Sequence, residues 1–104
     1  MKLRRDPFRD LILRQLDLFV EDEADLLEEC RARFRAYQDA DREDREQAYG
    51  DFADAVETAT EALADMRGRF ARTLDEDVAE TYEGSFNRTV RKRWPELGLE
   101  IENR

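Results

Sequence analysis

Histidine is absent from the 104-residue chain, and cysteine, proline and glycine are scarce, with one, two and four residues respectively. The absence of histidine excludes the Ser-His and Cys-His pairs of nucleophilic catalysis and the Glu-x-x-His ligands of di-iron helical bundles. The only cysteine, Cys30, cannot form a disulfide within the chain, so we expect a reducing, cytoplasmic location. The scarcity of helix-breaking residues favours helix nearly throughout.

Two further absences narrow the function. The sequence contains no glycine-rich loop of the kind that holds phosphates in nucleotide-binding folds, so we expect no cofactor. No apolar run approaches the roughly 20 residues that span a bilayer, and the first ten residues lack the apolar core of a signal peptide. We therefore expect no membrane partner.

The chain carries strong negative charge, with a formal net charge of −9 and a pI of about 4.6. A surface of this sign repels the phosphates of nucleic acids, which makes general nucleic-acid binding improbable. Six Phe, three Tyr and one Trp nevertheless provide enough apolar surface for a folded core. The length suits a single domain.

Two long segments carry apolar residues at alternating spacings of three and four, the coiled-coil pattern of helices packed at a shallow angle. The first helix is predicted over residues 7–38, starting at Asp6-Pro7, and the second over residues 44–74. Because the connection is short, the two helices should form an antiparallel hairpin with Phe34 opposite Phe52. Cys30 falls on this seam and should pack as a small apolar residue.

A shorter third helix is predicted over residues 76–93, because Val78, Tyr82, Phe86, Val90 and Trp94 recur at intervals of four. The expected fold is therefore all-α, a three-helix bundle over residues 1–94. The two long helices would each reach about 45 Å, which is long for a lone monomer of this size. Their wide apolar stripes predict a homodimer.

The C-terminal residues 95–104 are predicted to form an extended tail, since Leu97, Leu99 and Ile101 alternate with Glu or Gly. Together with Trp94, these three residues are the candidate surface for binding a protein partner. Two alternatives remain open, namely packing against the chain's own bundle and pairing with the same tail of a second copy.

A polar residue interrupts the seam of the first helix at Glu23, where an unpaired buried carboxylate would cost several kcal/mol. We expect Glu23 to reach the rim of the core and to pair with Arg67 of the second helix or with an arginine of the third. Alternatively, Glu23 determines the register of the hairpin or belongs to a polar pocket.

Basic residues cluster at two places in this acidic chain, near the N-terminus and at the end of the third helix. The second cluster is a basic patch of Arg88, Arg91, Lys92 and Arg93, which the dipole at a helix C-terminus already favours. The two clusters could meet, because the third helix must return toward one end of the hairpin. This arrangement offers an alternative function, the binding of phosphate or nucleic acid.

The sequence provides one enzymatic alternative, a Mg²⁺ site of clustered carboxylates like that of all-helical nucleotide pyrophosphohydrolases. Glu43-x-x-Glu46 and Glu80-x-x-Glu83 have the first required spacing, but no Glu-x-x-Asp follows at a suitable distance. We therefore expect no metal site. The favoured hypothesis is a non-catalytic interaction or scaffolding protein.

Overall fold

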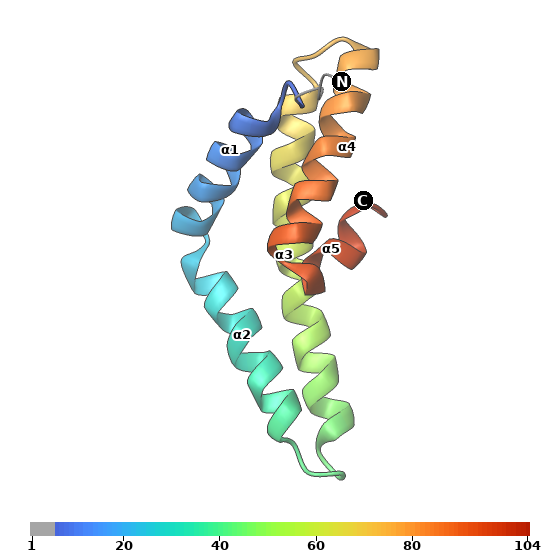
Figure 1. Ribbon diagram of the computed structural model, residues 1–104. Helices are drawn as coiled ribbons and strands as arrows, with labels where there is room; N and C mark the ends of the chain where they lie inside the picture. Colours follow the sequence, from blue (N-terminus) through green and yellow to red (C-terminus); the bar gives the residue numbers. More distant parts are fainter. Residues whose placement is uncertain (1–5) are drawn as a thin grey trace, which may run out of the picture.

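The computed structural model describes residues 6–104, except for the side chains of residues 97–99. These residues form helices α1 (Arg9–Asp22), α2 (Ala24–Asp39), α3 (Arg45–Ala71), α4 (Glu76–Arg93) and α5 (Pro95–Ile101), shown in Figure 1. No strand is present within residues 6–104, so the predicted all-α class is confirmed. None of the described helices combines the length and the apolar character needed to cross a membrane.

The central helix of the molecule is α3, and different helices cover its two halves (Figure 1). The N-terminal half of α3 runs antiparallel to α2, whereas its C-terminal half lies beside α4, which in turn packs against α1. The short helix α5 folds back and packs against both α3 and α4. The molecule is therefore elongated, with dimensions of 52 × 32 × 24 Å.

The predicted helix over residues 7–38 is divided at Glu23, whose backbone leaves helical geometry with φ −116° and ψ 33°. Glu23 ends one helix and begins the next, since its N–H donates to the Phe19 carbonyl oxygen at 2.8 Å and its own carbonyl oxygen accepts from the Leu27 N–H at 3.0 Å. Figure 1 shows α1 and α2 turning at this point. The bend lets α1 pack against α4 while α2 stays on α3.

The predicted register of the hairpin is confirmed near its turn. The ring centroids of Phe34 and Phe52 lie 5.2 Å apart, and Arg33 of α2 pairs with Asp51 of α3 at 3.9 Å. A short connection forces the two helices to run antiparallel, so the residues equidistant from the turn meet.

The core of the bundle is built around Tyr82 of α4, which is completely buried. Its ring contacts Phe8 at 5.4 Å, Phe70 at 4.8 Å and Phe86 at 5.9 Å between centroids. Its hydroxyl donates to Oε1 of Gln15 at 2.8 Å, which satisfies the polar end of the ring. The spacing of four that predicted the third helix therefore identified a face that is buried from Tyr82 to Trp94, whereas Val78, its first member, is 42% exposed.

The predicted extended tail is wrong, because residues 95–101 form α5. Pro95 takes the first helical position, where its missing N–H group costs no hydrogen bond. Ile101, at the end of α5, is completely buried. The alternation of Leu and Ile extends over too few residues to predict a strand reliably. The helix is favoured instead by Pro95 at its first position and by hydrogen bonds from Arg67 to its C-terminal end.

Candidate functional sites

The candidate partner-binding residues Trp94 and Ile101 lie in the core. Trp94 is 8% exposed, and its ring packs edge-on against Phe19 with centroids 5.9 Å apart. The structure does not describe the side chains of Leu97 and Leu99. The burial of Trp94 and Ile101 agrees with the alternative prediction, in which the C-terminal segment packs against the chain's own bundle. These two side chains are therefore not accessible to a partner.

The expected pair of Glu23 and Arg67 does not form. Glu23 lies half-buried at the bend, whereas the guanidinium of Arg67 turns toward α4 and α5. It donates to Oδ1 of Asn87 at 2.8 Å and to the carbonyl oxygens of Ile101 and Arg104 at 3.0 and 2.7 Å. Arg67 is therefore the anchor of α5, because it satisfies carbonyl groups that a helix end leaves free.

The basic patch at the end of α4 separates into two groups. Arg91 pairs with Glu102 and Arg93 pairs with Asp17 of α1, the latter at 3.0 Å. Arg88 and Lys92 instead line a hollow between α4 and the start of α1. Arg91 and Arg93 thus form ion pairs within the fold, although Arg93 also lines the edge of the hollow.

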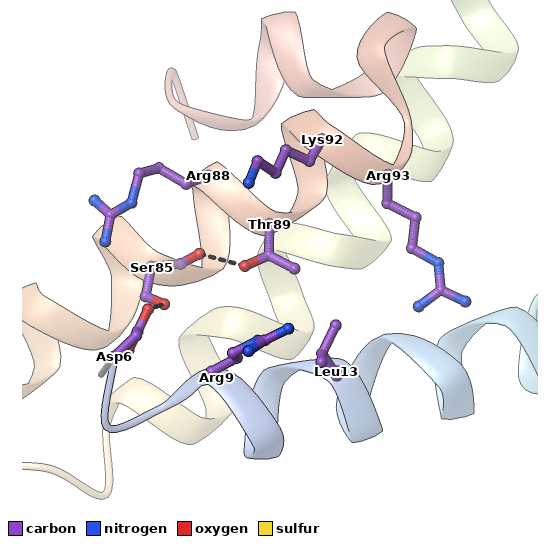
Figure 2. Close-up of a pocket in the computed structure, with 8 residues that line it drawn as sticks. All are labelled: Asp6, Arg9, Leu13, Ser85, Arg88, Thr89, Lys92 and Arg93. Atoms are coloured by element: carbon purple, nitrogen blue, oxygen red, sulfur yellow. Dashed lines mark hydrogen bonds between the residues drawn. The ribbon is translucent and has the colours of Figure 1, made fainter. Parts of the chain in front are cut away.

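This hollow, the basic cleft, has a volume of about 400 Å³ and is shown in Figure 2. The α1 side contributes Asp6, Arg9 and Leu13, and α4 contributes Ser85, Arg88, Thr89, Lys92 and Arg93. The α4 residues recur at intervals of three and four, which places them along one stripe of the helix. The two basic clusters of the sequence therefore meet, at least through Arg9.

A hydrogen bond closes one end of the basic cleft. Ser85 donates its hydroxyl to Oδ2 of Asp6, and the backbone N–H of Phe8 donates to Oδ1 at 2.9 Å. The Ser85 hydrogen bond, with smaller contributions from Phe8 and the positive charge of Arg88, lowers the pKa of Asp6 despite its partial burial. The carboxylate thus holds the segment before α1 against α4.

A second surface lies at the opposite end of the molecule, where α2 and α3 extend beyond α4 (Figure 1). Four aromatic side chains pack across this part of the hairpin, with Tyr37 centred 5.4 Å from Tyr49 and 6.5 Å from Phe52. Phe34 and Tyr49 remain 41% and 54% exposed. We call Phe34, Tyr37, Tyr49 and Phe52 the aromatic end.

A groove of about 240 Å³ runs along the aromatic end, lined by Cys30, Arg31, Phe34, Arg35, Phe52 and Glu96. Since Glu96 lies in the first turn of α5, the groove begins where α4 ends and α5 starts. Cys30 is 5% exposed and packs in the core, as predicted, and its burial raises the pKa of the thiol. Phe34 and Phe52 give the groove an apolar floor, and the two arginines border it.

The Glu-x-x-Glu spacings of the sequence do not lie on one face, since Glu43 is in the turn before α3, Glu46 and Glu80 are exposed helical residues, and Glu83 is half-buried. Glu43 and Glu46 border a shallow hollow with Asp51 and Asp54, and Glu83 lies in another hollow near Glu61. Within the described part of the chain, no three Cys, Asp or Glu residues are grouped closely enough to hold a metal ion.

The roles of Asp6, Ser85 and the aromatic end were not predicted from the sequence. Asp6 and Ser85 are 79 positions apart, so no local pattern joins them. The aromatic end did leave a signal, because Phe34 and Tyr37 precede the turn at the same spacing of three with which Tyr49 and Phe52 follow it.

Comparisons with protein-family models, with curated proteins and with solved structures give no match to this chain.

Proposed function

We propose that the chain is a non-catalytic helical scaffold that works as a homodimer through its aromatic end. The observation that carries this proposal is the half-exposed aromatic cluster on the part of α2 and α3 that α4 does not cover. Aromatic residues with large exposed surfaces are typical of protein interfaces, where they contribute much of the binding energy.

The partner that fits this surface is a second copy of the chain. In one half of the molecule α4 and α5 pack against α3, and α4 also packs against α1, whereas the other half consists of α2 and α3 only. When the α2–α3 ends of two copies pack face to face, they form a four-helix bundle. This bundle buries an apolar stripe that remains exposed to solvent on a single α2–α3 pair. The groove supplies the recess into which Phe34 of the second copy would insert.

The charges around the aromatic end also suit a symmetric contact. Arg31 and Arg35, which line the groove, both pair with Glu28, at 3.8 and 3.1 Å, so both signs occur beside the groove. In a two-fold symmetric interface, every contact between two different residues occurs twice, once from each copy. A surface that carries both signs of charge can therefore be complementary to itself. A cytoplasmic location, as the single cysteine suggests, remains part of this proposal.

Sedimentation equilibrium of the wild-type chain and of single glutamate variants tests the dimer. Phe34→Glu and Tyr49→Glu place a charge in the proposed interface and should shift the chain to a monomer. Leu18→Glu and Val78→Glu are the matched controls, because these residues are 51% and 42% exposed but lie on α1 and α4. Both controls should remain dimeric, and circular dichroism should show the same helix content in all four variants.

Two outcomes would overturn the proposal. A wild-type chain that is monomeric at millimolar concentration would leave the aromatic end without its partner. A dimer that the Leu18 or Val78 variant dissociates, while the Phe34 and Tyr49 variants remain dimeric, would place the interface on another face.

A further inference from the structure

The basic cleft concentrates positive charge on a chain whose net charge is −9. Four of its lining side chains are cationic and one, Asp6, is anionic. Arg93 is partly neutralised by Asp17, but the ion pairs found among residues 6–104 include none from Arg9, Arg88 or Lys92. Like charges placed together repel one another, and Asp6 is the only carboxylate among the residues that line the cleft, so an anion would relieve this repulsion.

We propose that the basic cleft binds a small phosphate-bearing molecule, which is independent of the proposed dimer. Arg9 comes from α1, whereas Arg88, Lys92 and Arg93 come from α4, so a phosphate group in the cleft can receive hydrogen bonds from two helices (Figure 2). Charge-assisted hydrogen bonds of this kind are among the strongest in proteins, and arginine suits phosphate geometry.

The carboxylate of Asp6 does not prevent anion binding. Both carboxylate oxygens accept hydrogen bonds, from the Ser85 hydroxyl and from the backbone N–H of Phe8. These two donors partly offset the negative charge of Asp6 at one end of the cleft. Its structural effect is to hold the segment before α1 in place, which positions Arg9 opposite α4. Leu13, 37% exposed, adds an apolar wall against which the non-phosphate part of a ligand can pack.

The dimensions of the cleft favour a small molecule over a nucleic acid. A volume of about 400 Å³ lies within the range of small-molecule sites, which begins at about 300 Å³. A nucleic acid would have to follow a longer basic stripe, but the neighbouring Arg91 and Arg93 are paired with Glu102 and Asp17. The chain as a whole carries a net charge of −9, which repels the phosphates of a duplex.

Titration with inorganic pyrophosphate, followed by ¹H–¹⁵N NMR, tests this site. The amide signals of Arg9, Ser85, Thr89 and Lys92 should shift together and saturate. Arg9→Gln and Lys92→Gln should each raise the dissociation constant about tenfold, the loss expected when one charged hydrogen-bond donor is removed. Arg42→Gln is the control, because it makes the same change of charge in the turn between α2 and α3, and it should leave the constant within about twofold of the wild type.

The proposal is overturned if the cleft signals do not move, or if Arg42→Gln weakens binding as much as the two cleft variants, because binding would then reflect net charge alone. A parallel titration with a DNA duplex should produce no saturating shift at the same amides. Tighter binding of the duplex than of pyrophosphate would show that the basic cleft serves a nucleic acid instead. Neither titration depends on the Phe34 and Tyr49 variants, so this proposal and the dimer can fail separately.

Discussion

Arg67 of α3 donates a hydrogen bond of 3.0 Å to the backbone carbonyl oxygen of Ile101, 34 residues further along the chain. The same guanidinium reaches Asn87 and Arg104, and it is only 7% exposed. One side chain thus joins three helices and holds α5 against the bundle. Its Nε–H is buried without a partner, so part of the desolvation cost of the charge is not recovered.

Arg67→Met should lower the free energy of unfolding by about 2–4 kcal/mol, because the carbonyl oxygens and Asn87 lose a charged donor in a buried place. Urea denaturation measures this loss, and hydrogen exchange should show faster exchange of the α5 amides. Arg69→Met on the exposed face of the same helix is the control and should stay within about 0.5 kcal/mol of the wild type. Equal stability of the two variants would show that Arg67 does not anchor α5.

Tyr82→Phe should lower the free energy of unfolding by about 1 kcal/mol, because it removes the hydrogen bond to Gln15 while keeping the buried ring. Thermal denaturation of the variant measures this difference. Tyr49→Phe, which makes the same change on a ring that is 54% exposed, should have almost no effect. A larger loss at Tyr49 than at Tyr82 would contradict the placement of Tyr82 at the centre of the core.

Asp6 should make stability depend on pH in the acid range. Its pKa in the folded protein lies below the ordinary value of 3.8, so its contribution is fully present above pH 3.8 and is lost as the pH falls through the folded pKa. The stability advantage of the wild type over Asp6→Asn should therefore shrink below pH 3.8, as acid unfolding curves can measure.

The cause of this pKa shift can be tested by NMR titration of the Asp6 carboxyl carbon. Ser85→Ala removes the largest contribution, so the pKa of Asp6 should rise toward 3.8. Thr81→Ala, which also removes a hydroxyl from α4 but at an exposed position, should leave the titration of Asp6 unchanged. An Asp6 pKa that is the same in the wild type and in Ser85→Ala would refute this assignment.

Part of the candidate sites was accessible from the sequence. The basic residues at the end of α4 were visible as a cluster, and the antiparallel hairpin brought Phe34 and Phe52 together as predicted. The sequence could not separate Arg88 and Lys92, which line the basic cleft, from Arg91, which pairs with Glu102. That distinction depends on which elements lie beside each face of α4.

Local periodicity in the sequence was enough to predict the helical class, the hairpin near its turn and the face of α4 that is buried from Tyr82 to Trp94, although not the exposure of Val78 on the same face. These follow because residues three and four apart share a helix face whatever their surroundings. Only the tertiary structure decided the bend at Glu23, the helical state of residues 95–101 and the partners of Arg67. Each of these depends on contacts between residues far apart in the chain, whose free energy outweighs the small local preference for another conformation.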